Sequence, residues 1–193
     1  IKSNLGVNLM TLSTCRKPYL AEKIVMVGGL DGCGKTLFSP IISALDRVEL
    51  PTYSYEIEHY CSLYFLQKLS LQSASTLIRM QTDLKLYNTM MGREVNFRPT
   101  DLSSVQMFHS PTQYFERLFQ PGDETIPDVI NKKNPILNLI IHNVLFISDP
   151  IWNALESRCV YINIINSYLE NNGYKKTILL YPDNYFMDFV DNS

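Results

Sequence analysis

The stretch Ile24-Val25-Met26-Val27, followed by Gly28-Gly29-Leu30-Asp31-Gly32-Cys33-Gly34-Lys35-Thr36, decides the fold of this chain. Its first four residues are apolar and mostly β-branched, which is typical of a strand buried in a parallel sheet. A glycine-rich turn comes next. Apolar residues then recur at helical spacing, at Leu37, Phe38, Ile41, Ile42 and Leu45. The segment therefore predicts a strand, a tight loop and a helix, with a kink in the helix at Pro40.

Residues 29–36 match the pattern G-x-x-x-x-G-K-[ST] in this strand–loop–helix setting, which is the pattern of a phosphate-binding loop, or P-loop. Glycines let successive backbone N–H groups turn toward an anion, and the dipole of the following helix favours negative charge there. The Lys35 ammonium adds a full charge for the outer phosphates, and the Thr36 hydroxyl is placed to hold Mg²⁺. We expect nucleotide contacts from Gly29, Leu30, Asp31, Gly32, Cys33, Gly34, Lys35, Thr36 and Leu37. The competing interpretation is a glycine-rich turn that binds nothing.

The composition is that of one globular domain. Of the 193 residues, 46% are hydrophobic and 19% are charged, and the net charge is −2. This balance argues against a nucleic-acid or membrane partner, and no apolar run reaches the ~18–20 residues that span a bilayer. The four cysteines (Cys15, Cys33, Cys61 and Cys159) lack disulfide-framework or metal-site spacing, and the first residues lack a signal-peptide pattern. We therefore expect a cytoplasmic protein; its oligomeric state is left open.

Strand and helix patterns alternate along the chain. Strands are predicted at 24–27, 136–141 and 159–164, with weaker ones at 48–55 and 177–181. Pro51 allows the first weak segment to be only an edge strand or an extended loop. Helices are predicted at 57–69, 77–91, 101–108, 112–119 and 150–156. This alternation predicts an α/β fold, a three-layer parallel sheet with helices on both faces, in a single domain at 23–193 after an extension at 1–22.

An acidic partner for the loop is expected at the end of a neighbouring strand, where it would anchor Mg²⁺. Asp149 follows the apolar run 144–147 and has this form. The alternative, which we favour, is a helix cap, since Asp149 precedes Pro150 at the start of a predicted helix.

Three arginines are candidates for binding phosphate or for a lid: Arg79, Arg93 and Arg98. The segments 92–93 and 97–99 would form the mobile part. Each arginine taken alone is more often a surface ion pair. His59, beside two glutamates, is a candidate general base, whereas His142 lies in an apolar run and is interpreted as a core histidine.

The loop resembles the opening motif of thymidylate-kinase-type nucleotide kinases, which carry an aspartate and a glycine where this chain has Asp31 and Gly32. This resemblance implies that Asp31 contacts the acceptor nucleotide, that Lys35 binds the β- and γ-phosphates and that Thr36 binds Mg²⁺. Asp31 and Lys35 are then the catalytic residues. The arginine motif that those kinases carry after their first helix is not recognisable here.

A second resemblance extends over more of the chain. The order of the loop, a helix, the segment 50–53 and then 135–141 and 159–164 is similar to sulfotransferase-like P-loop proteins, whose loop holds the phosphosulfate of a donor nucleotide. Their third strand leads into an Arg and a Ser that bind the donor's 3′-phosphate, where this chain has Ile165 and Gly173. Lys35 also stands where that family usually has Ser or Thr. Residues 166–193 resemble neither family and are interpreted as a divergent or truncated end.

The sequence therefore leaves three alternative functions, in order of preference. The first is phosphoryl transfer from ATP with Mg²⁺ to a small acceptor. The second is sulfuryl transfer from a phosphosulfate nucleotide without a metal. The third is a nucleotide-binding interaction module that has lost its chemistry.

Overall fold

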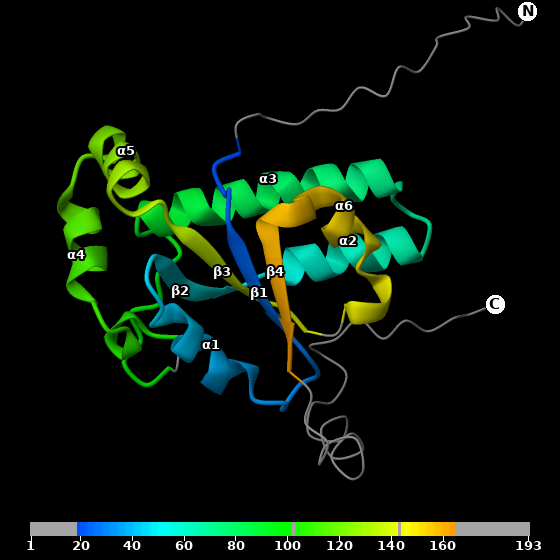
Figure 1. Cartoon of the computed structure of the whole chain (residues 1–193), viewed down its shortest axis with the longest axis horizontal. Helices are drawn as coiled ribbons and strands as arrows, with labels where there is room; N and C mark the ends of the chain where they lie inside the picture. The colour runs from blue at the N-terminus through cyan, green and yellow to red at the C-terminus, as the bar shows by residue number, and fades with distance from the viewer. Residues whose placement is uncertain (1–18, 102, 143, 165–193) are drawn as a thin grey trace, which may run out of the picture.

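A computed structural model of the chain describes residues 19–101, 103–142 and 144–164. These residues form a single α/β domain around a parallel sheet of four strands in the order β2-β3-β1-β4 (Figure 1). The strands are β1 (Ile24–Gly28), β2 (Val48–Tyr53), β3 (Ile136–Ile140) and β4 (Cys159–Asn163). The fold class predicted from the sequence is confirmed. The strand predicted at 177–181, together with Ile165 and Gly173, lies outside the described residues.

The places of β1 and β2 in the sheet agree with their composition. β1 pairs with β3 on one side and with β4 on the other, and Ile24, Met26 and Val27 in it are almost fully buried. Among the described strands, β2 lies at an edge and pairs with β3 alone, with a register irregularity between Val48 and Pro51. An edge strand tolerates Pro51 because proline has no N–H to donate to a second neighbour.

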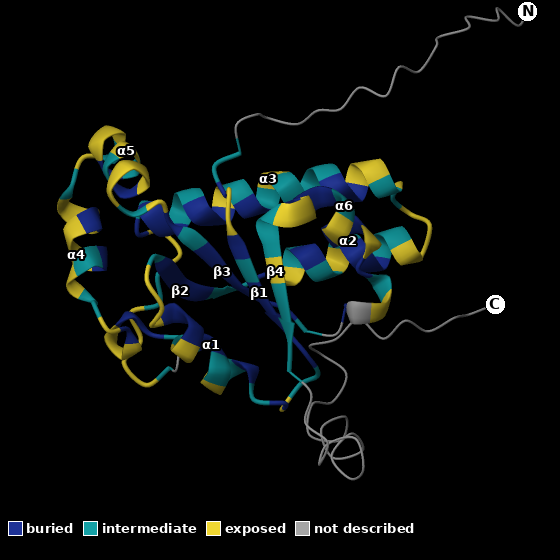
Figure 2. Ribbon diagram, in the orientation of Figure 1, coloured by how far each residue is buried: buried dark blue, intermediate teal, exposed yellow. Residues whose placement is uncertain are grey.

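Helices cover both faces of the sheet (Figures 1 and 2). α1 (Lys35–Ser43) packs on one face, where Val27, Ile42 and Val48 form a buried cluster. α2 (Tyr55–Phe65), α3 (Leu71–Met90) and α6 (Asp149–Leu155) enclose the larger core on the other face. α1 continues past Pro40 and ends two residues before Leu45.

Several helices differ from the sequence prediction. α2 begins two residues before the predicted segment 57–69 and ends four residues before the end of that segment. α3 starts six residues before the predicted position, where the Ser70 side chain accepts the Ser73 N–H and caps the helix. α5 (Gly122–Lys133) was not predicted; it contains Pro127 and begins with a glycine. α4 (Thr112–Phe119) agrees with the prediction, whereas the helix predicted at 101–108 is only the 3₁₀ turn η1 (Val105–Met107). Two further 3₁₀ turns, η2 (Leu145–Ile147) and η3 (Glu156–Arg158), flank α6.

The parallel arrangement gathers the carboxyl ends of all the described strands at one edge of the sheet. The glycine-rich loop follows β1, Tyr53 ends β2 and His142 follows β3. Backbone bonds continue the sheet to this edge: the Ile164 N–H donates to Gly28 O at 2.8 Å and the Ile141 N–H to Val27 O at 3.0 Å. Ligands of open α/β sheets bind at this edge. In the described part of the chain, no helix has both the length and the apolar character to cross a membrane.

Candidate active site

The glycines of the loop are required by its backbone shape. Gly29 has φ of +143° and Gly34 has φ of +100°, both in the region that side chains rarely adopt. A Cβ atom on Gly29 would lie 2.5 Å from the backbone oxygen of Ile164 and 2.8 Å from Cys33 Sγ. The loop is therefore pressed against the end of β4 as closely as glycine allows.

The loop presents unpaired backbone donors at the start of α1. Gly34 caps the helix, and its carbonyl accepts the N–H groups of Leu37 and Phe38 at 3.0 Å. Within the described residues, the N–H groups of Gly34, Lys35 and Thr36 have no acceptor. Free amides at a helix start form an anion-binding position together with the positive end of the helix dipole.

The Lys35 side chain folds back into the loop. Its Nζ atom donates to the carbonyl oxygens of Gly29 and Leu30, both at 2.7 Å, and lies 3.8 Å from Asp31 Oδ1. The residue is only 5% exposed. Burial lowers the pKa of the Lys35 ammonium, opposed by the negative groups at Cys33, Asp31 and Glu58. The structure thus places a buried cation among the atoms predicted to hold phosphate.

A histidine joins two carboxylates beside this lysine. His142 Nε2 lies 3.2 Å from Asp31 Oδ1, and its Nδ1 lies 2.9 Å from Glu58 Oε1. Glu58 Oε1 also accepts the backbone N–H of His142 at 3.0 Å, which fixes the ring at the end of β3. His142, interpreted as a core histidine, is largely buried and hydrogen-bonded as that interpretation expects, but its ring partners are Asp31 and Glu58 beside the loop and it belongs to none of the apolar core clusters. His59 is exposed on α2 and joins no part of this network in the described structure.

Two tyrosines line the same edge. Tyr53, the last residue of β2, places its hydroxyl 3.3 Å from the Thr36 hydroxyl of the loop. Tyr55, the first residue of α2, is 51% exposed, and its ring lies parallel to those of Tyr53 and His142. An aromatic surface therefore adjoins the loop.

Thr36 and Asp149 are the two residues predicted to bind metal, and no described contact joins them. Thr36 lies in the loop, and its hydroxyl is hydrogen-bonded to the hydroxyl of Tyr53. Asp149 is exposed in the first turn of α6, after Ser148, which takes the cap position. The charge of Asp149 contributes to the raised pKa of the Cys61 thiol, about 12, which is due first to burial and next to Glu58. Among the described residues, no cluster of three His, Cys, Asp or Glu side chains has the arrangement of a metal site.

The three candidate arginines make other contacts. Arg79 donates to the carbonyls of Asn153 and Ala154 at 2.8 and 3.1 Å and so ties α3 to the end of α6. The Arg93 guanidinium lies over the Tyr87 ring, 5.5 Å from its centroid, and Arg98 is exposed. In the described structure none of these guanidinium groups touches the loop, and no contact supports a lid.

A buried hydroxyl lies beneath the loop. Tyr161 Oη is buried without a hydrogen-bond partner among the described residues. A Cβ atom on Gly28 would lie 2.1 Å from it, so glycine is needed there for the strand to pass the ring. Burial raises the pKa of Tyr161, and the charges of Cys159, Cys33 and Glu58 act in the same direction.

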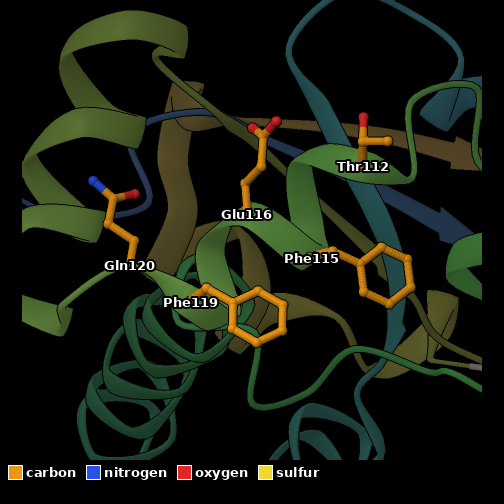
Figure 3. Close-up of a pocket in the computed structure, with 5 residues that line it drawn as sticks. All are labelled: Thr112, Phe115, Glu116, Phe119 and Gln120. Atoms are coloured by element: carbon orange, nitrogen blue, oxygen red, sulfur yellow. The ribbon is translucent and has the colours of Figure 1, made fainter.

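A surface hollow of about 590 Å³ lies elsewhere, along α4 (Figure 3). Its lining side chains come from α4 and from the residue that caps its end: Thr112, Phe115, Glu116, Phe119 and Gln120. Glu116 is the one charged member of this lining, so the hollow offers no cation to a phosphate. The candidate site is therefore the edge of the sheet and not this hollow.

Sequence reasoning missed His142, Glu58, Tyr53 and Tyr55 as parts of the site. A signal was present for two of them, because Tyr53 and His142 follow apolar strand segments, where the carboxyl ends of parallel strands meet. Glu58 and Tyr55 lie on the first turns of α2 and carry no such signal.

Comparison with protein-family models, with curated proteins and with solved structures finds no match to this chain.

Proposed function

We propose that this chain is a P-loop transferase, which binds the phosphate groups of a nucleotide donor on residues 29–37 and passes a group to a hydroxyl of a small acceptor. One observation carries the proposal. The ammonium of Lys35 lies inside a glycine loop whose free amides, at Gly34, Lys35 and Thr36, stand at the start of a helix. Amides and an ammonium in this arrangement stabilise the charge that develops on a transferred group.

The acceptor side of the reaction is assigned to Asp31 and His142. Glu58 holds the imidazole through Nδ1, so that Nε2 faces the loop beside Asp31. A hydroxyl that approaches the donor next to this pair can pass its proton to it as the new bond forms. Lys35 binds the donor in this proposal. Because its Nζ atom is 3.8 Å from Asp31 Oδ1, the donor and the acceptor would meet beside this pair.

Phosphoryl transfer from ATP would involve Mg²⁺, which is held through one or two carboxylates together with substrate phosphates and water. When bound, the ion neutralises charge on the transferring phosphate. Thr36 offers a hydroxyl, but this hydroxyl is hydrogen-bonded to that of Tyr53, and Asp149 is exposed in the first turn of α6 with no described contact to the loop. Asp31 is shared between Lys35 and His142. The oxygen atoms of Thr36, Asp149 and Asp31 therefore fit a Mg²⁺ site poorly.

His142, two residues after the end of β3, places an imidazole rather than a carboxylate beside the loop. This observation favours the second candidate, sulfuryl transfer from a phosphosulfate nucleotide. Its donor is held by the amides and Lys35, and the acceptor's proton is taken up by the Asp31–His142 pair. Sulfuryl transfer is the function that the loop amides, Lys35 and the Asp31–His142 pair together support best.

A calorimetric titration of the full chain with ATP, Mg-ATP and adenosine 3′,5′-bisphosphate tests the proposal. We expect the bisphosphate to bind without metal and Lys35→Ala to weaken it at least about tenfold, as is usual for loss of a buried charged hydrogen-bond partner. Lys132→Ala, which removes an exposed lysine on α5, is the matched control. Binding that requires Mg-ATP would favour phosphoryl transfer. Absence of binding to all three would overturn the proposal.

Turnover separates an enzyme from an interaction module. A chain that binds nucleotide but transfers neither group to any acceptor would be the interaction module. A cytoplasmic setting fits this proposal, because Cys33, Cys61 and Cys159 are free thiols.

A further inference from the structure

The helix α3, which lies on the outside of the domain, carries an apolar stripe on its solvent side (Figure 1). The members of this stripe, called the outer seam below, are Leu77, Met80, Leu84, Tyr87 and the cap residue Met91. Met80 is 62% exposed and Leu84 is 49% exposed, and the other three side chains are half-buried. The outer seam is therefore apolar surface that the described part of the chain leaves at least partly open.

The spacing of the outer seam is that of a helix pair. Its members alternate at intervals of three and four residues, which gives the narrow stripe that one other helix covers. α3 already has a second apolar face in the core, where Ile78 and Leu86 are fully buried. Apolar residues scattered singly over a surface need no explanation, whereas a row of five at this spacing indicates a partner.

The charges of α3 are turned away from solvent or used within the chain. Its three charged residues are Arg79, Asp83 and Lys85. Arg79 donates to carbonyl oxygens at the end of α6, and Asp83 accepts the backbone N–H groups of residues 20–21. Lys85 is 4% exposed and lies within 3.6 Å of two carboxylates. Two copies of this face would therefore meet without the like-charge repulsion that normally prevents self-association.

The outer seam is also nearly symmetric about its central residue, Leu84. Leu77 and Met91 each lie seven residues from Leu84, and Met80 and Tyr87 lie four and three residues from it. A two-fold interface needs such a self-complementary surface, because each contact occurs twice with the roles exchanged. In two antiparallel copies of α3 with Leu84 on the axis, Leu77 of each copy meets Met91 of the other. Met80 meets Tyr87 in the same way.

Arg93 favours the antiparallel arrangement over the parallel one. Its guanidinium lies over the Tyr87 ring near one end of the outer seam, 5.5 Å from the ring centroid. In a parallel pair the two guanidinium groups would lie side by side and repel each other. In an antiparallel pair they lie at opposite ends of the interface.

We propose that the outer seam of α3 is a self-association surface, on which two copies of this chain pair antiparallel about a two-fold axis at Leu84. A helix rises 1.5 Å per residue and is about 10 Å wide, so the seam covers on the order of 200 Å² per copy. This is well below the ~800 Å² per partner of a standard interface. The dimer is therefore a reversible one, which forms at micromolar or higher concentration. The proposal is independent of the proposed function.

Sedimentation velocity of the full chain in reducing buffer, from about 5 to about 500 µM, tests the proposal. We expect a monomer–dimer equilibrium. Leu84→Lys and Leu84→Glu each place two like charges at the axis and should weaken association at least about tenfold. An equimolar mixture of these two variants should regain association, because each lysine then faces a glutamate. Ile41→Lys, at a residue that is 63% exposed on α1, is the matched control and should leave association unchanged.

A second mixture reports the direction of the helices. Met80→Lys mixed with Tyr87→Glu should associate more strongly than either variant alone, because these positions meet in an antiparallel pair. Recovery only in a mixture of Met80→Lys with Met80→Glu would overturn the antiparallel arrangement. A chain that stays monomeric over the whole range, with the outer seam covered by another segment or reserved for a different protein, would overturn the proposal. So would a dimer that Leu84→Lys leaves unchanged.

Discussion

Among single residues, Lys35 is the key to the candidate site. Its side chain is deeply buried, and its ammonium donates hydrogen bonds to two carbonyl oxygens of the loop. Burial lowers the pKa of its ammonium from the ordinary 10.5, and Cys33, Asp31 and Glu58 oppose this only in part. A bound phosphate group would favour the charged form and raise the pKa again. In the proposed function, nucleotide binding would therefore be linked to proton uptake on Lys35.

The sign of this linkage gives a pH prediction. As pH rises through the lowered pKa, free Lys35 loses its proton, and binding of an anion must then restore it. The affinity for adenosine 3′,5′-bisphosphate should fall with rising pH, starting below 10.5. Lys35→Arg should remove this alkaline fall, because arginine stays charged. Calorimetry in buffers of different ionisation enthalpy measures the proton uptake, and a flat alkaline profile in the native chain would contradict the prediction.

Gly29→Ala tests how tightly the loop is pressed against β4. The new methyl group would meet Ile164 O at 2.5 Å, and φ of +143° is unfavourable for alanine. We expect a loss of about 1–3 kcal/mol in the free energy of unfolding, as for other strained backbone positions, together with loss of nucleotide binding. Urea unfolding measures the first effect. Gly34→Ala, at φ of +100° with no atom near its Cβ position, isolates the backbone cost from the contact.

At the scale of elements, a buried ion pair fastens α4 to β2. Arg117 donates to both oxygens of Glu49, at 2.8 and 3.0 Å, and Tyr114 Oη donates to Glu49 Oε2 at 2.8 Å. Glu49 and Arg117 are 2% and 5% exposed. Burial first, and then the Glu49 charge, raise the pKa of the Tyr114 hydroxyl. The pair fixes where α4 docks on the edge of the sheet.

Arg117→Met should cost about 3–5 kcal/mol in the free energy of unfolding, because it leaves the Glu49 carboxylate buried without its cation. The double variant Glu49→Leu, Arg117→Met should recover part of this loss. In that variant Tyr114 Oη still accepts the Leu50 N–H, but its own O–H loses the Glu49 acceptor, which costs about 1 kcal/mol. A double-mutant cycle by urea unfolding measures the coupling. Two single-variant losses that simply add would show that the pair is not coupled.

The elements also show what local sequence can predict. The β1–loop–α1 segment was predictable because its strand, turn and helix signals agree with one another. α5 was not, because Gly122 and Pro127 are both weak helix residues, and Asp123 and Glu124 in its first turn were the remaining signal. The early turns of α3 are rich in serine and lack an apolar stripe, so its start was placed too late.

At the scale of the whole molecule, the site depends on strand order. The loop could be predicted because its residues are contiguous. His142 and Tyr53 could not be joined to it, because their place beside Asp31 and Thr36 follows from β3 lying between β1 and β2. Pairings of strands far apart in the chain leave no periodicity in either segment. A pattern search therefore finds the glycine-rich loop and misses the His142 and Tyr53 side chains that lie beside it.

Packing between distant segments also places the single tryptophan where its fluorescence can report on the loop. Trp152, the single tryptophan, packs edge-on against Tyr161 with centroids 5.7 Å apart, and the Tyr161 hydroxyl lies directly beneath Gly28 at the start of the loop. Nucleotide bound at the loop should therefore change the Trp152 fluorescence in a saturable way. Tyr161→Phe removes a buried hydroxyl that has no partner among the described residues, so it should raise the free energy of unfolding by about 1 kcal/mol. It should also reduce the fluorescence change while leaving the calorimetric affinity for adenosine 3′,5′-bisphosphate intact. An undiminished signal in Tyr161→Phe would mean that the loop reaches Trp152 by another route.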